Sequence, residues 1–241
     1  MSGAERRLRV VSFNIRRASD RRGSHLPQLI AEVLRRLEPD LVALQEVDSR
    51  LQAVDGRDQL AFIAARTGAV AVAGPNIHHA GGRFYGNAVL ARLPVLEVRR
   101  VDLSVGRAEP RGALDLDLRA PGGVVVRLVA AHLGLRAAER RRQVGRLLTQ
   151  LGRHRRALTV VAGDFNEWRP LNRTVRRLDR RLGASPRRRT FPALAPLLAL
   201  DRLWVDPAGA LDALEVVRGP RVERVSDHLP LCASIRLPAS P

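Results

Sequence analysis

Short apolar runs alternate along the chain with longer segments in which apolar residues recur at helical spacing. Some short runs alternate apolar and polar residues, as GALDLDLRA does, and others are almost continuously apolar, as VVVRLVAAHL is. The first pattern is typical of a half-buried strand and the second of a strand buried on both faces. We predict strands in residues 8–15, 41–47, 69–74, 87–103, 112–120, 124–133, 158–165, 201–205, 214–219 and 231–237.

Helical spacing occurs in four segments between these runs. In LPQLIAEVLRRLEP, residues 26–39, the apolar side chains fall on one helix face, and residues 58–67, 135–153 and 171–183 follow the same rule. About ten strands with four helices is too strand-rich for a strict βαβ fold. We predict an α/β fold of four layers, in which two packed mixed β-sheets are flanked by helices. Because no repeat or Gly/Ser linker divides the chain, we expect a single catalytic domain over residues 1–241.

Polar side chains stand at the ends of several apolar runs. They are Asn14, Glu46, His132, Asp164, Asn166, Asp201, Asp227 and His228. Taken singly, each is explained by a turn or by a hydrogen-bonded core residue. If the strands run side by side, however, their ends form one cleft that contains carboxylates, amides and imidazoles.

The run VVAGDFNEW places Asp164 and Asn166 two positions apart at the end of an apolar strand. Because side chains alternate along an extended segment, we expect both to point to the same face. Burying such a pair is costly without partners, so the two residues either cap the next segment or serve a site.

The charge of the chain is strongly positive. Its 241 residues include 42 basic and 24 acidic ones, a net charge of +18, and every basic residue is an arginine. We attribute the absence of lysine to coding bias and give it no function. The charge excess favours a polyanionic partner such as nucleic acid, anionic lipid or a phosphorylated metabolite, and the alternative is a solvated basic surface.

Composition also excludes several classes of protein. The single cysteine, Cys232, rules out an internal disulfide and a cysteine-rich metal site, and its apolar surroundings predict a core position. No apolar stretch is long enough for a transmembrane helix, and MSGAERRLRVVSFNIRR lacks the apolar segment of a secretory signal. We therefore expect a cytoplasmic protein, and we expect a monomer.

The residue types at the strand ends favour a metal-dependent hydrolase. Glutamate, aspartate and asparagine supply the hard oxygen ligands of Mg²⁺ and Mn²⁺, and histidines beside them titrate near neutral pH. With a basic surface, this set favours metal-assisted attack of water on a phosphoester. Because a carboxylate repels a phosphodiester, the acids of this set suit the metal or the attacking water and not the phosphate. We assign Glu46 to the metal, and Asp164, as an acid that faces away from the metal, to the proton of the water. The chain has no G-x-S-x-G sequence, which disfavours a serine hydrolase.

Eight motifs follow one another over residues 8–237: SFNIRR, LQEVD, YGNAVLARLP, PRGAL, AHLG, AGDFNEW, LDRLWV and SDHLPL. In this set the chain resembles the endonuclease/exonuclease/phosphatase superfamily, the DNase I-like metal-dependent phosphohydrolases. The resemblance implies Mg²⁺ as cofactor, with Mn²⁺ as a substitute. It implies that Glu46 is the principal metal ligand and that Asn14 contacts the same metal. Asp227 would orient His228 and touch a metal, and His228 would polarise the scissile phosphate.

The same resemblance implies roles for the remaining strand-end residues. Asp164 would position or deprotonate the attacking water, while Asn166 and His132 would hydrogen-bond phosphate oxygens. Asp201 would support the catalytic histidine or the metal site. Three further residues fall where family members contact phosphate: Tyr85, Asn87 and Arg111.

The shared machinery of the superfamily does not name a substrate. The basic surface favours DNA or RNA, and hence a nuclease. The arginine-rich segment 172–196 either brings arginines beside the cleft or forms a solvated helix face and loop. An aromatic content of 3% leaves few platforms for base stacking, so contact with the backbone is favoured. The alternatives are a phosphodiesterase or phosphatase for phospholipid headgroups or inositol phosphates, acting at anionic membranes, and a catalytically silent anion-binding module.

Overall fold

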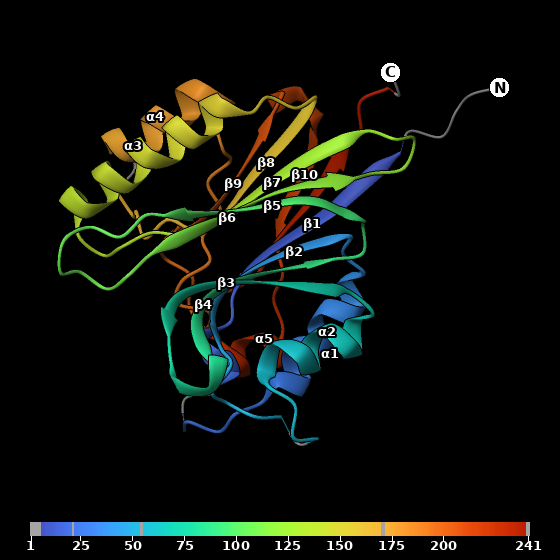
Figure 1. The fold of residues 1–241 in the computed structure, drawn as a ribbon, viewed down its shortest axis with the longest axis vertical. Helices are drawn as coiled ribbons and strands as arrows, with labels where there is room; N and C mark the ends of the chain where they lie inside the picture. The colour runs from blue at the N-terminus through green and yellow to red at the C-terminus, as the bar shows by residue number, and fades with distance from the viewer. Residues whose placement is uncertain (1–5, 21, 54, 170–171, 240–241) are drawn as a thin grey trace.

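The computed structural model of the protein describes residues 6–239 except 21, 54, 170 and 171. Two β-sheets pack face to face, and helices cover the outer face of each (Figure 1). The six-stranded sheet has the order β10 (Leu211–Val216), β11 (Leu231–Arg236), β1 (Arg7–Asn14), β2 (Leu41–Asp48), β4 (Phe84–Ala91) and β3 (Val70–His78). The five-stranded sheet has the order β5 (Val95–Asp102), β6 (Gly112–Arg119), β7 (Val125–His132), β8 (Leu158–Asp164) and β9 (Asp201–Asp206). The α-helices are α1 (Pro27–Leu37), α2 (Gln59–Thr67), α3 (Ala137–Arg153), α4 (Arg173–Leu182) and α5 (Pro220–Val225).

Three apolar cores separate the four layers. Between the sheets, aliphatic side chains alternate along the strands: on β1, Leu8 and Val10 point into this inner core, and Val11 and Phe13 point outward. The helices α1, α2 and α5 pack on the outer face of the six-stranded sheet, and α3 and α4 pack on the five-stranded one. The predicted α/β fold with two packed mixed sheets between helices is confirmed.

The strand directions bring polar ends together. β1 runs parallel to β2, and β7 runs parallel to β8. Because side chains alternate, Asn14 continues the inner-facing series of Val10, and Asp164 continues that of Ala162. The carboxyl ends of these strands therefore present their polar residues between the two sheets.

Besides shifts in bounds, as in β10 (predicted 214–219) and β3 (predicted 69–74), the structure differs from the predicted elements in two places. The predicted run 87–103 is two strands in different sheets, because β4 ends at Ala91 and β5 begins at Val95 after Pro94. Apolar residues lie on both sides of the proline, so the pattern reads as one run. Helix α5 was not predicted, since six residues are too few to display helical periodicity.

Two further points concern the limits of the helices. Leu171, at the start of the predicted helical segment 171–183, lies outside the described residues, as does the N-terminal stretch 1–5. Among the described helices, none combines the length and the apolar character needed to cross a bilayer.

Candidate active site

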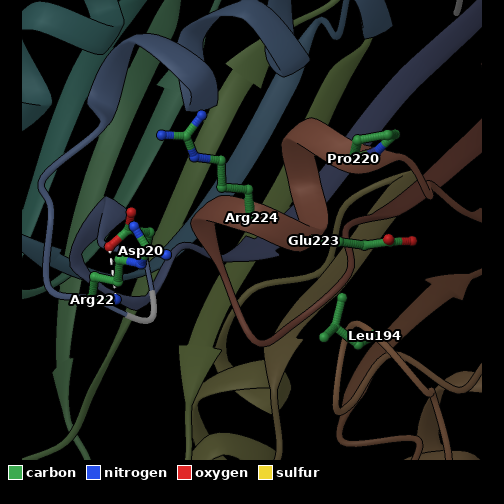
Figure 2. Close-up of a pocket in the computed structure, with 6 residues that line it drawn as sticks. All are labelled: Asp20, Arg22, Leu194, Pro220, Glu223 and Arg224. Carbon is green, nitrogen blue, oxygen red and sulfur yellow. Dashed lines mark hydrogen bonds between the residues drawn. The ribbon is translucent and has the colours of Figure 1, made fainter.

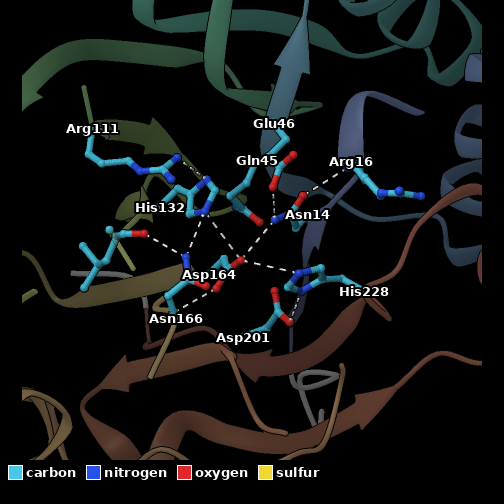
Figure 3. A network of polar contacts seen from close by, with 12 residues as sticks. Asn14, Arg16, Gln45, Glu46, Arg111, His132, Asp164, Asn166, Asp201 and His228 are labelled. Atoms are coloured by element: carbon cyan, nitrogen blue, oxygen red, sulfur yellow. Dashed lines mark hydrogen bonds and ion pairs between the residues drawn. The ribbon is translucent and has the colours of Figure 1, made fainter. Parts of the chain in front are cut away.

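Asp164 is the central residue of a polar network between the two sheets (Figure 3). It ends β8, and its register partner on β7 is His132. Gly163 precedes it with φ of 149°, and a Cβ at this position would lie 1.8 Å from the carbonyl oxygen of Ala131. Because only glycine fits so close to the neighbouring backbone, Gly163 allows the two polar strand ends to lie side by side.

Asn166 follows β8 in a tight turn. Its φ is 50°, and its backbone N–H donates to Oδ1 of Asp164 at 2.9 Å. Its side-chain Nδ2 donates to the carbonyl oxygen of Leu133 at 2.9 Å. Asp164 and Asn166 therefore meet at one site, as predicted. The alternation on which this was predicted is wrong, because the extended segment ends at Asp164.

Arg111 determines which nitrogen of His132 carries the proton. A guanidinium only donates, so Nδ1 of His132, 3.2 Å from NH1 of Arg111, accepts and Nε2 bears the hydrogen. Burial lowers the pKa of His132 to about 3, with Arg111 adding to the effect and Asp164 opposing it, so the imidazole is neutral at pH 7. Nε2 lies 3.2 Å from Nδ2 of Asn166 and 3.6 Å from Oδ2 of Asp164. Two N–H donors thus converge, which is the arrangement an anionic oxygen requires.

Glu46 reaches the network through a β-bulge. Ala43 of β2 faces the inner core and Leu44 faces outward, so regular alternation would turn Glu46 outward as well. The pairing of β2 with β4 shifts between Leu44 and Val47, and Glu46 has a φ of 57°. The bulge reverses the alternation and turns Glu46 toward β1.

Asn14 links Glu46 to Asp164. Its Nδ2 donates to Oε1 of Glu46 and to Oδ2 of Asp164, each at 3.0 Å. Its Oδ1 accepts the backbone N–H of Arg16 at 3.0 Å, which fixes the orientation of the amide. The two carboxylates are therefore held on either side of one carboxamide.

Asp201 orients His228. Its Oδ2 lies 2.9 Å from Nδ1 of the imidazole and accepts the hydroxyl of Thr190 at 2.5 Å. Nε2 of His228 lies 3.7 Å from Oδ2 of Asp164. Burial opposes a charged imidazole, but the carboxylates of Asp201 and Asp164 outweigh it and raise the pKa of His228 to about 10. His228 is therefore a cationic donor at neutral pH.

Asp227, which the resemblance implies would orient His228 and touch a metal, lies at the rim of the network. Its carboxylate is 38% exposed and lies 3.5 Å from Nε of Arg16. Its charge adds to the raised pKa of His228, but the hydrogen bond to the imidazole comes from Asp201. The reason is position: Asp227 follows α5 at the rim, whereas Asp201 begins β9 inside the molecule.

The three residues predicted to contact phosphate lie in different places. Arg111 belongs to the network through His132. Tyr85 is buried at its margin, where burial and the charge of Glu46 raise the pKa of the phenol. Asn87 donates from Nδ2 to the carbonyl oxygen of Gly112 at 2.8 Å and so ties β4 to β6 across the sheets.

A buried ion pair that the sequence did not reveal stabilises the turn around Asn166. Arg140 of α3 donates to Oε2 of Glu167 from Nε at 3.2 Å and from NH2 at 2.9 Å. Its NH1 also donates to the carbonyl oxygen of Gly134 at 3.3 Å. The pair joins the start of α3 to the residue after Asn166. The only sequence signal is an acid directly after GDFN, and it does not identify the partner.

On the side of Glu46, the oxygen atoms of the network are suited to bind a divalent cation. Nδ2 of Asn14 engages Oε1 of Glu46, and Oε2 of this half-buried carboxylate is the oxygen that a cation would take. Hard cations are held in proteins by one or two carboxylates with carbonyl or amide oxygens and water. Glu46 and the neighbouring Asp164 supply such carboxylates, and Asn14 bridges them through its N–H groups.

A second group of potential ligands is less suitable. The ligand atoms of Asp164, Asp201 and His228 lie within 4.8 Å of one another, and within the described chain Oδ1 of Asp201 is buried without a hydrogen-bond partner. His228, however, uses Nδ1 for Asp201, so only its Nε2 is left for a ligand. The Glu46 side is therefore the candidate metal centre.

Two packed mixed sheets between layers of helices define the DNase I-like fold. A family model described as "Endonuclease/Exonuclease/phosphatase family" matches residues 11–228. The chain belongs to this family, whose members are generally hydrolases of phosphoester bonds and are typically dependent on divalent metals.

Related proteins are similar to this one in sequence or in fold over nearly the whole chain. The uncharacterized protein YbhP of Escherichia coli (strain K12) is 33% identical over 248 residues, which covers 95% of this chain and 96% of that protein. The fold is similar to a family structure from Beutenbergia cavernae DSM 12333, with a TM-score of 0.74 and 24% identity, covering 98% of this chain and 73% of that one. It is also similar to a family structure from Bacteroides thetaiotaomicron, with a TM-score of 0.78 and 15% identity, covering 98% and 100%.

Proposed function

We propose that the protein is a Mg²⁺-dependent phosphodiesterase that cleaves nucleic acid by attack of water. One observation carries the proposal: N–H donors of His132, Asn14 and His228 surround the carboxylate of Asp164, next to Glu46. Such donors stabilise anionic oxygens, and a carboxylate among them takes a proton. The residues of the site lie on strands of both sheets, from β1 near the N-terminus to β9, which supports a single catalytic domain.

Each side chain has one role in this proposal. Glu46 would hold the cation, with Mn²⁺ as a substitute, and Asn14 would orient the Glu46 carboxylate through its Nδ2. When bound, a divalent cation neutralises charge on a phosphate and lowers the pKa of water. Asp164 accepts the proton of the attacking water.

The other side of the site binds the phosphate. His228, held by Asp201, donates from Nε2 to an oxygen of the scissile phosphate. Nε2 of His132 and Nδ2 of Asn166 lie 3.2 Å apart and donate to another phosphate oxygen. Charge and hydrogen bonds of this kind stabilise the charge that develops during phosphoryl transfer.

The proposed class of substrate rests on the positive charge of the protein. With 42 arginines and a net charge of +18, the protein favours a long polyanion over a small ester. Arginine binds phosphate through two parallel N–H donors, and this contact needs no base stacking.

The test is hydrolysis with and without chelation. We expect EDTA to abolish cleavage of bis(p-nitrophenyl) phosphate and of nucleic acid, and Mg²⁺ to restore it. Glu46→Ala should lower kcat/KM by at least about 100-fold, because several kcal/mol of stabilisation are lost. Glu215→Ala, on the exposed side of β10, is the matched control and should leave kcat/KM unchanged.

Two outcomes would contradict the proposal. Activity that survives chelation would exclude the metal mechanism. In a panel of plasmid DNA, single-stranded DNA, RNA, phospholipid and inositol phosphates, cleavage of only the lipid or inositol substrates would exclude nucleic acid as the substrate.

A further inference from the structure

The helices α3 and α4 lie side by side on the outer face of the five-stranded sheet (Figure 1). Their apolar sides are buried, with Val144 and Leu147 of α3 and Val175 and Leu178 of α4 in one core. Their outward sides are dominated by arginine. The two helices together hold ten arginines and only two acids.

Both acids of these helices already have partners. Glu139 is buried and accepts a hydrogen bond from Nε2 of Gln143 at 3.0 Å. Asp179 accepts the indole N–H of Trp204 at 2.7 Å. Neither carboxylate is directed to the exposed arginines, so the outward charge of the pair is not compensated from within the helices.

The exposed arginines of α4 form a stripe. Arg173, Arg176 and Arg180 are spaced by three and four residues, which places them on one helix face, and all three are exposed. Within the described residues, none of the three has an acidic partner within 4.0 Å. A groove of about 620 Å³ follows the stripe and is lined by these residues with Arg177, Asp179 and Ala184.

A second surface cavity differs from the α4 groove in the charge of its lining residues. The cavity of about 540 Å³ beside α5 is lined by two acids, Asp20 and Glu223, and two arginines, Arg22 and Arg224 (Figure 2). In it Asp20 is occupied by local hydrogen bonds, including one from the backbone N–H of Arg22 at 2.9 Å. That cavity has balanced charge and selects no anion, whereas the groove along α4 is cationic.

The stripe begins at the end of the sheet where the active site lies. α3 begins five residues after His132, and α4 begins nine residues after Asp164. NH1 of Arg177 donates to the carbonyl oxygen of Arg141 at 3.3 Å, which ties the two helices together. A strand held in the active site can therefore leave it along α4.

We infer that the Arg173–Arg176–Arg180 stripe binds the sugar–phosphate backbone of a single nucleic-acid strand whose scissile phosphodiester lies in the active site. The inference rests on the proposed function and names a second contact for the same substrate. At a rise of about 1.5 Å per residue, Arg173 and Arg180 are about 10 Å apart along the axis. In a strand stacked as in duplex DNA, at roughly 3.4 Å per nucleotide, that length spans about three phosphates.

A lipid surface fits this face less well. A helix that lies on a membrane buries an apolar face in it. The large apolar residues that are exposed in the described chain all lie outside α3 and α4: Val70, Leu96, Leu135, Trp168, Leu194 and Leu197. Contact through charge alone suits a phosphate backbone.

The test compares Arg176→Gln/Arg180→Gln with Arg35→Gln/Arg36→Gln, which removes the same charge from exposed positions of α1. Binding of a fluorescent 20-nucleotide single strand is measured by anisotropy in EDTA at several salt concentrations. We expect the slope of log affinity against log salt to fall by about 1.4 for the α4 variant, since each phosphate contact contributes roughly 0.7. The α1 control should keep the wild-type slope.

Activity supplies a second readout. With Mg²⁺, the α4 variant should raise KM for the 20-nucleotide strand about 5-fold or more, while kcat/KM for bis(p-nitrophenyl) phosphate stays unchanged. An equal effect of both variants on the slope would overturn the inference, as would cosedimentation with phosphatidylserine vesicles that only the α4 variant loses while nucleic-acid binding is retained. Failure of the wild type to hydrolyse any phosphodiester would refute the proposed function instead, and the anisotropy slope would still test the stripe.

Discussion

Glu46 and Asn166 show that backbone conformation decides the chemistry of single residues. Both are non-glycine residues with positive φ, 57° and 50°, a conformation that costs on the order of 1–3 kcal/mol each. The hydrogen bonds from Asn14 to Glu46 and from Asn166 to Asp164 and Leu133 offset this strain. Both strained residues lie at the same site, which agrees with the tendency of backbone strain to occur where functional side chains must converge.

The two acids near His228 give a prediction at this scale. Asp201→Asn should lower kcat by about 100-fold or more, because the amide no longer fixes the imidazole in its charged, oriented form. Asp227→Asn should lower kcat by less than about 10-fold, because its carboxylate lies at the rim. Steady-state kinetics with bis(p-nitrophenyl) phosphate tests this, with circular dichroism to confirm folding. Equal losses in the two variants would return the orienting role to Asp227.

Among the elements, the connections after β7 and β8 depend on each other. The backbone N–H of Gly134 donates to Oε1 of Gln143 at 2.8 Å, and a Cβ at Gly134 would lie 2.0 Å from the carboxyl carbon of Glu139. The start of α3 thus packs directly on the loop that carries Leu133. Arg140 and Glu167 then tie α3 to the turn of Asn166, so both loops are held from one helix.

The Arg140–Glu167 ion pair leads to a prediction about the free energy of unfolding of three variants. Arg140→Met and Glu167→Met should each destabilise the protein by about 3–5 kcal/mol, because each leaves a buried charge without its partner. The double variant should lose much less than the sum, since both charges are then removed. Urea unfolding measures the three values. Additive losses would mean that the two side chains act independently.

For the whole molecule, a buried ionic cluster joins the five-stranded sheet to α3. Asp115 accepts hydrogen bonds from Arg127 at 2.8 and 2.6 Å, from Arg99 at 2.9 Å and from Gln150 at 2.7 Å. Burial raises the pKa of this carboxyl group, but these donors outweigh burial and lower the pKa to about 2. The cluster therefore favours the folded state only while Asp115 is ionised.

The pH dependence of stability follows from this sign. The pKa of Asp115 is about 2 when folded and about 3.9 when unfolded, so its contribution is complete above pH 4 to 5 and is lost as the pH falls toward 2. The contribution is on the order of 2 kcal/mol. Urea midpoints between pH 6 and 2.5 should show that the gap between wild type and Asp115→Asn narrows on acidification. A gap that is constant with pH would show that the carboxyl group is not linked to unfolding.

The sequence by itself determined the types of element and most residues of the site. Alternation in the strand runs places Asn14, His132 and Asp164 on the same face as the inner core, because the period of two holds up to the end of each strand. The packed sheets, the outer helices and the arginine face of α4 are also contained in local pattern and charge.

The tertiary structure alone decided which strand ends meet and which side chains they present. The bulge at Glu46 arises from pairing with β4, and the choice of Asp201 over Asp227 depends on a partner 27 residues from His228. The hydroxyl of Thr190 and the Arg140–Glu167 pair come from similarly distant segments. Periodicity reports only the nearest neighbours of a residue, whereas these contacts are set by the register and packing of two sheets.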